Sequence, residues 1–177
     1  MMPIGPLMIE HRLIEKVIEI IRLETENIRQ GKKLEILYID TIVDFIRVYA
    51  ERTHHGKEED ILFKELKNKQ LTNEDLRIMN ELINEHIIAR KLVKELMEAK
   101  NKFIANNLDE QKVIIEKLDN LVKLYPGHIR KEDKIFFPSA MKYLNKEEQE
   151  KMIDEMWEFD RKMIHEKYRM VVENLKP

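Results

Sequence analysis

The stretch HHGKEEDILF, residues 54–63, has a near copy in HIRKEDKIFF, residues 128–137, and both obey the pattern H-x-x-K-E-[ED]-x-I-x-F. A second pair of segments repeats in the same way, because EHRLIEKVIEII begins at Glu10 and EHIIARKLVKEL begins at Glu85. The offsets are 74 residues for the first pair and 75 for the second. Repetition at a nearly fixed offset indicates two joined units of one design. The sequence therefore predicts two helical hairpins, each with one lone histidine and one His-x-x-x-Glu pair.

The composition favours long helices. Of the 177 residues, 43% are hydrophobic and 37% are charged, with only four glycines and five prolines. This balance argues against a β-sandwich or barrel, which needs many turns. The formal net charge of −2 gives no reason to expect nucleic acid or an anionic membrane as a partner.

The chain contains no cysteine. Thiolate metal sites, disulfides and cysteine nucleophiles are therefore excluded together. The first residues, MMPIGPLMIEHR, lack the basic region and the sustained apolar run of a signal peptide. No stretch reaches the roughly 18 consecutive apolar residues that a membrane-spanning helix needs. We expect a cytoplasmic protein.

Helix start and stop signals divide the chain into four long helices and a C-terminal one. Gly31 is a typical stop for the first helix, and Thr72 or Asn73 can cap the third. Pro126 and Gly127 fall inside the fourth, where we expect an interruption and a kink. The expected helices cover about residues 6–30, 34–69, 73–105, 111–143 and 145–177.

Four long helices with short connections predict an all-α fold, an up-down-up-down four-helix bundle with an additional C-terminal helix. Residues 1–144 are expected to form the bundle from the two repeated hairpins. Residues 145–177 are expected to form the additional helix, packed on the bundle and anchored by Trp157.

The His-x-x-x-Glu spacing permits metal binding. Residues four apart on a helix lie on one face, so His54 with Glu58 can present a nitrogen and a carboxylate to the same point. His11 and His86 fall in register with the apolar positions of their own helices. Inward residues at matching heights in a bundle converge. The predicted ligands are four imidazoles and two carboxylates: His11, His54, Glu58, His86, His128 and Glu132.

The donor set indicates which metal is expected. A buried carboxylate without a partner costs several kcal/mol, and one or two dications would remove that cost. Six ligands are too many for one tetrahedral zinc ion, whereas imidazoles and carboxylates together suit iron or manganese. We expect two iron ions, with manganese or zinc as alternatives. A lone buried histidine is more often an ordinary core residue, and a single His-x-x-x-Glu on a charged helix is commonly a surface pair. The paired repeat makes coincidence a poor explanation.

The motif order His, His-x-x-x-Glu, His, His-x-x-x-Glu resembles the hemerythrin-like family, also called HHE cation-binding domains. The likeness covers roughly residues 7–144, and the phrases KEEDILF and KEDKIFFP are specific to it. The resemblance implies a helical bundle whose six predicted ligands hold a non-haem di-iron centre. It also implies that Glu58 and Glu132 are the carboxylates that bridge the two ions.

The sequence departs from the oxygen-carrying members at two positions. Where those proteins have a second histidine on the third helix, this chain has Arg90. They also use an aspartate five residues after the fourth-helix histidine, where this chain offers both Glu132 and Asp133. We favour Glu132, because residue i+5 of a regular helix points away, although a bulge near residues 126–127 would favour Asp133. The departures are closer to members that act in nitrosative stress and iron-centre repair.

Two further histidines and a tyrosine remain. His55 follows His54 and should point about 100° away on a regular helix, so an outer or solvated position is the better expectation. His165 lies outside the four-helix core and is expected to be exposed or structural. Tyr125 is expected to pack in the core, one turn from His128.

Two classes of function fit this pattern. In the first, the protein binds a small diatomic ligand such as O2 or NO, or iron itself, for sensing, storage or stress response. In the second, it is a di-iron enzyme with peroxidase, NO-handling or O2-reducing activity. Both need an open coordination position, so the ligand count does not separate them; we favour binding. A mononuclear zinc site or a purely structural site is a third reading.

Overall fold

The computed structural model describes residues 2–174 of the chain, with side chains to residue 172. Every regular element in this part of the chain is helical, and none is a strand. The all-α prediction is therefore confirmed. The first helix, α1 (Ile4–Arg29), ends as expected before Gly31, whose φ of 103° lies in the region that favours glycine.

The second helical segment departs from regular α-helix where it carries the repeat motif. It begins as an α-helix and continues in two π-helical stretches, in which backbone hydrogen bonds join residues five apart. Its parts are α2 (Ile36–Asp44), η1 (Phe45–His55), η2 (Glu58–Phe63) and α3 (Lys64–Leu66). The hydroxyl of Thr53 also donates to the carbonyl of Val48, five residues earlier, at 2.7 Å.

The third and fourth segments show the same contrast. The helix α4 (Asn73–Ile104) is regular along its whole length. The fourth segment consists of α5 (Glu110–Lys131), η3 (Glu132–Phe136), α6 (Phe137–Ala140) and η4 (Met141–Tyr143). The helix α5 continues through Pro126, so the interruption expected there is absent. The π-helical stretch begins instead at Glu132, within the repeat motif.

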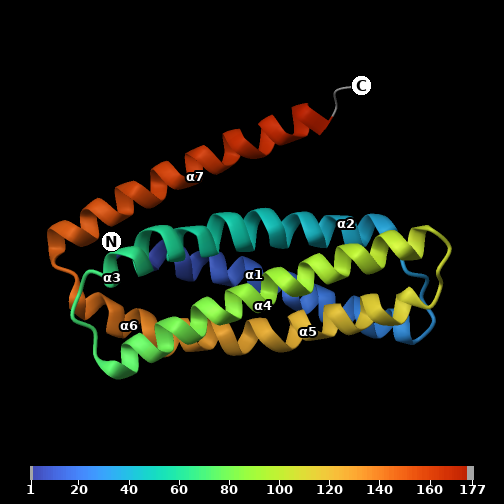
Figure 1. Ribbon diagram of the computed structural model, residues 1–177, viewed down its shortest axis with the longest axis horizontal. Coiled ribbons are helices and arrows are strands. Elements are labelled where there is room, and N and C mark those ends of the chain that lie inside the picture. The colour runs from blue at the N-terminus through green and yellow to red at the C-terminus, as the bar shows by residue number, and fades with distance from the viewer. Residues whose placement is uncertain (1, 175–177) are drawn as a thin grey trace.

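Figure 1 shows how the elements lie in space. The helices α1, α2, α4 and α5 lie lengthwise beside one another, and α4 and α5 are in extensive contact. The last helix, α7 (Lys146–Asn174), runs outside them on the side of α2 and diverges from them toward its C-terminal end. It packs against η1 and η2 of the second segment, and Lys167 also pairs with Asp44 at the end of α2.

The interior contains two apolar clusters with a polar layer between them. Along α1, the buried residues Leu7, His11 and Ile14 follow one another at helical spacing. Leu7 belongs to one apolar cluster and Ile14 to the other, so His11 lies between the two. The core therefore places the candidate site between the two apolar clusters. Met152 and Met156 extend one of the clusters onto α7.

Trp157 does not anchor α7 as expected, because 56% of it is exposed. The buried side chains of Met152 and Met156 do this instead. Among the helices that the structure describes, none is both long enough and apolar enough to cross a membrane.

Thr72 is the observed N-cap of α4, and its loss should destabilise the protein. The Thr72 hydroxyl oxygen accepts a hydrogen bond from the backbone N–H of Asp75 at 3.1 Å. Thr72→Ala should therefore lower the free energy of unfolding by about 1 kcal/mol, measured by urea denaturation of the metal-free protein. Thr41→Ala, an exposed position inside α2, serves as the control. An equal loss of unfolding free energy in both variants would show that the N-cap hydrogen bond does not stabilise the protein.

Candidate metal centre

All six residues predicted as ligands are buried in the polar layer. They come from α1, the second segment, α4 and the fourth segment, and their nitrogens and carboxylates face a common centre. Together with His55 they form two groups of four donors that share Glu58, and within each group one ligand atom from every residue lies within 4.8 Å of the others. The groups are His11, His54, Glu58 and Glu132, and His55, Glu58, His86 and His128.

The first group lies against α1. The Nε2 atoms of His11 and His54 are 2.8 Å apart. Nε2 of His11 is 3.2 Å from Oε2 of Glu132, and Nε2 of His54 is 3.4 Å from Oε1 of Glu58. Each imidazole therefore faces both its partner ring and a carboxylate, which is the arrangement that a shared cation requires.

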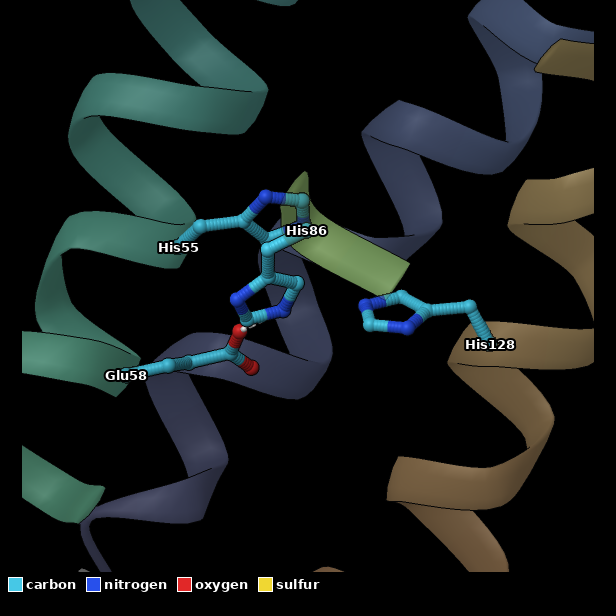
Figure 2. Close-up of side chains that lie close together, drawn as sticks. All are labelled: His55, Glu58, His86 and His128. Carbon is cyan, nitrogen blue, oxygen red and sulfur yellow. Dashed lines mark ion pairs between the residues drawn. The ribbon is translucent and has the colours of Figure 1, made fainter. Parts of the chain in front are cut away.

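The second group is drawn in Figure 2, where side chains from three helical segments converge. Nε2 of His86 is 3.3 Å from Oε2 of Glu58. The rings of His55 and His86 stack with centroids 3.8 Å apart and an angle of 12° between their planes. The His128 ring lies edge-on to His86, with centroids 4.9 Å apart.

Two carboxylates lie between the groups. Glu58 belongs to both, with one oxygen facing His54 and the other facing His86. The Oε2 atom of Glu132 is 3.2 Å from His11 and 3.3 Å from His128, and its Oε1 atom is 3.8 Å from His86. Each carboxylate can therefore serve two cations at once.

Six inward atoms of this layer have no hydrogen-bond partner, whereas the Nε2 atoms of His11 and His54 lie within hydrogen-bond distance of each other. Both carboxylate oxygens of Glu58 and of Glu132, and the Nε2 atoms of His86 and His128, are buried and unpartnered. Buried polar groups are nearly always hydrogen-bonded, and leaving a carboxylate without partners costs several kcal/mol. Divalent cations among these atoms would satisfy all of them. The residues present therefore fit a cation site.

Without a metal cation, protons bound to the histidines supply part of the positive charge in the layer. Burial by itself would lower the pKa of His11, but contacts with Asp133 and Glu132 outweigh burial and raise it to about 10. Burial is likewise outweighed at His86, whose pKa the carboxylates of Glu132 and Glu58 raise well above its usual value. The facing imidazoles hold the pKa of Glu132 well below its usual range despite its burial. The layer is thus arranged to hold positive charge.

An outer carboxylate holds the far nitrogen of each predicted histidine. Such a contact fixes the orientation of the ring and leaves Nε2 for a metal. The Nδ1-to-oxygen distances are 2.7 Å for His11–Asp133, 2.9 Å for His54–Glu10, 2.7 Å for His86–Glu59 and 2.8 Å for His128–Glu85. The sequence motifs did not predict this outer position for any of the four acids. Glu10 and Glu85 immediately precede a histidine in both copies of the repeat, which was the available signal.

His55 is the main difference from expectation. It is 1% exposed and stands beside His86 and His128, whereas a regular helix would turn it away from them. The reason is η1, because a π-helical turn holds more residues than an α-helical one and rotates adjacent residues less. Burial and the neighbouring imidazoles lower the pKa of His55 well below its usual value. Its Nδ1 lies 3.2 Å from Oε2 of Glu51.

Glu132 and Asp133 contact different atoms of the layer. Glu132 lies among the inward atoms, as favoured, and Asp133 is also buried but contacts the outer nitrogen of His11. Both are buried where η3 begins, with Glu132 facing the inner atoms and Asp133 facing the outer nitrogen of His11. The bulge considered as an alternative near residues 126–127 is absent there, and the helix widens a few residues later.

A cleft reaches the layer from the side of α7. Its volume is about 850 Å³, and Glu51 and Glu59 form part of its wall. Arg90 stands at this wall and makes ion pairs with both acids, with Nε 3.1 Å from Oε2 of Glu51. Burial raises the pKa of Glu51 to about 7, and Tyr125 donates a hydrogen bond to it at 3.3 Å.

The position of His165, the remaining histidine, agrees with the prediction from the sequence. His165 is exposed on α7, outside both groups of donors. Tyr125 is buried in the larger apolar cluster, as expected.

Comparison with known proteins identifies one family. The model of the family described as "Hemerythrin HHE cation binding domain" matches residues 2–140 of the chain. No curated protein and no solved structure matches the chain. The match covers all the residues of both donor groups.

Metal uptake should release protons, and the apparent affinity should rise with pH. An imidazole must lose its proton to bind a metal ion, and with a pKa of about 10 His11 carries one at neutral pH. We expect that calorimetric titration of Mn²⁺ at pH 7 in buffers of different ionisation enthalpy will give heats that vary with the buffer. Heats independent of the buffer would contradict this account of the metal-free layer.

Proposed function

This chain belongs to the hemerythrin HHE cation-binding domain family, and from this premise we propose that it holds two iron ions at which it binds a small diatomic ligand such as O2 or NO. One observation carries the proposal. The unpartnered carboxylates of Glu58 and Glu132 lie between two groups of buried imidazoles. Two cations that share both carboxylates would satisfy every inward atom, whereas one cation would leave one group of imidazoles without a partner. Manganese or zinc remain alternatives to iron.

The proposed ligands of the first ion are His11, His54, Glu58 and Glu132. Those of the second are His86, His128 and the same two carboxylates, with His55 as a seventh protein ligand. His55 would take the part of the second third-helix histidine that this chain lacks, since Arg90 stands at that position. Arg90 instead pairs with the acids beside His55 and His86.

Two ferrous ions would supply electrons and an open coordination position for O2 or NO. The protein supplies the surroundings. Phe63 stacks near His86, with ring centroids 6.0 Å apart, and Phe137 stacks near His11 at 5.7 Å. These buried rings exclude water from the layer on the side of the apolar cluster that contains Leu7. The cleft at Glu51 and Glu59 is a route by which a small molecule could reach the second group.

Ligand binding is favoured over catalysis because the layer is enclosed by apolar side chains, which protect a bound molecule from protons and solvent. The alternative is a di-iron enzyme with peroxidase, NO-handling or O2-reducing activity. The cleft at Glu51 and Glu59 favours this alternative in one respect, since charged side chains such as Arg90 lie at its wall. The departures from oxygen carriers agree with a role in sensing, iron storage, or a response to nitrosative stress.

The remaining expectations about organisation are also proposed. Residues 1–144 would form an up-down-up-down bundle from the two repeated hairpins, and residues 145–177 the additional helix; residues 175–177 lie outside the described part of the chain. We further propose a cytoplasmic protein without a nucleic-acid or membrane partner.

Iron analysis and optical spectra test the central proposal. The purified protein should contain two iron ions per chain, and the anaerobically reduced protein should gain new absorption on exposure to O2 or NO. Restoration of the reduced spectrum on removal of the gas would indicate binding. Sustained consumption of peroxide or NO would favour the enzyme. A protein that takes up one zinc ion and no iron would refute the di-iron proposal.

Glu58→Ala should lower the metal content from two ions toward one or none, because both groups lose a shared donor. Asp60→Ala is the matched control, since Asp60 is an exposed acid in the same helical stretch. Metal content is measured by elemental analysis after reconstitution with Fe²⁺. Two ions at unchanged affinity in the Glu58 variant would rule out its sharing between the ions.

His55→Ala should weaken the second ion selectively. The first ion keeps all its donors, so a titration should resolve one site unchanged and one weakened at least tenfold. His165→Ala removes an exposed histidine and should change neither site. Two unchanged sites in the His55 variant would return His55 to an outer, non-ligating role.

A further inference from the structure

Lys57 is a buried cation whose surroundings the metal centre alone does not explain. It is 0% exposed, and its ammonium group contacts the carboxylate of Glu10. Glu10 in turn holds Nδ1 of His54 at 2.9 Å. The second partner of Lys57 comes from α7, because its Nζ lies 2.7 Å from Oδ1 of Asp160. Three polar contacts therefore connect α7 to a histidine of the first donor group.

The second copy of the repeat provides an internal comparison. Lys131 stands three residues after His128, as Lys57 does after His54. It contacts Glu85 at 2.6 Å, and Glu85 holds Nδ1 of His128 at 2.8 Å. Its further partner is Glu81 of α4, also at 2.6 Å.

The two copies differ in where the outermost acid comes from. In the second copy every member lies on α4 or α5, and Lys131 is 19% exposed to solvent. In the first copy the acid comes from α7, and the lysine is fully enclosed. A buried ammonium depends strongly on its few partners, whereas solvent can substitute for a partner of a part-exposed one. Asp160 should therefore matter more to His54 than Glu81 does to His128.

The packing of α7 places Asp160 close to the site. Gly56, between His55 and Lys57, allows this approach, because a Cβ at this position would lie 2.7 Å from Cζ of Phe159. Beyond Asp160, α7 is held by ion pairs between exposed groups, such as Arg52–Glu166 at 2.6 Å. Exposed pairs of this kind contribute little to docking. After Met152 and Met156, the contacts near Asp160 are therefore the main ones that hold α7 to the bundle.

We propose that Asp160 is a positioning residue of the metal centre, acting through Lys57 and Glu10 on His54, so that docking of α7 and occupation of the first metal position stabilise each other. This inference rests on the proposed metal function. A metal-bound histidine must donate its other N–H to an acceptor, and loss of such outer partners typically weakens metal binding 10- to 100-fold. Coupling between two events is reciprocal, so a bound metal must equally favour the docked helix.

The test measures metal affinity and α7 protection in the same full-length samples. Fe²⁺ is titrated anaerobically, and backbone hydrogen exchange of α7 is followed by mass spectrometry with and without Fe²⁺. In the unmodified protein, Fe²⁺ should slow exchange in α7. Asp160→Asn should weaken one of the two sites about tenfold and abolish the slowing. Asp160→Glu, which retains the carboxylate, should preserve most of both effects.

Glu166→Gln is the matched control, because it removes an ion pair between α7 and η1 that has no connection to a histidine. It should leave both iron sites and the Fe²⁺-dependent slowing unchanged. Circular dichroism establishes that each variant is folded. Unchanged iron binding and unchanged slowing in Asp160→Asn would overturn the proposal, as would equal losses in Asp160→Asn and Glu166→Gln. If the unmodified protein binds no iron, the proposed function itself fails; two bound ions without coupling to α7 refute this inference alone.

Discussion

The structure depends on one electrostatic constraint: carboxylates and imidazoles are enclosed between two apolar clusters, with most of their inner atoms unpartnered. Such a layer is stable only if positive charge enters it. Protons supply part of that charge in the metal-free protein, as the raised pKa values of His11 and His86 show. A pair of divalent cations would supply it more completely, because each carboxylate has one oxygen or more facing each donor group.

The constraint extends outward in alternating charge. Inside are the imidazoles; around them are acids that hold Nδ1, and around these are cations that hold the acids. Arg12 contacts Asp133, Lys57 contacts Glu10, and Lys131 contacts Glu85. Each shell restricts the side chains of the one inside it, which reduces the conformational freedom that metal binding would otherwise have to remove. Each of the two repeated hairpins carries this sequence of imidazole, acid and cation. The two differ because α7 supplies an acid to Lys57 in the first copy only.

Backbone irregularity allows so many functional groups to face one centre. The three π-helical stretches carry His54 and His55, Glu58 and Glu59, and Glu132 and Asp133. On a regular helix, adjacent residues diverge by about 100°, whereas they diverge less on a π-helical turn, which holds more residues. Wider turns let both members serve the site, one toward the inner atoms and its neighbour at the site or its rim. This agrees with the general concentration of π-helical turns at functional sites.

The sequence by itself determined the helical class, the main breaks between helices and the six inward residues, because helical periodicity and an internal repeat are local properties of the chain. It also identified the family. It could not place His55 or give Asp133 its role, since both depend on departures from α-helical geometry. Nor could it connect Asp160 with His54, which are 106 residues apart in the chain. Only the packing of α7 against η1 and η2 brings Asp160 close to Lys57, because the partner of a buried lysine is decided by the acid that the tertiary fold places beside it.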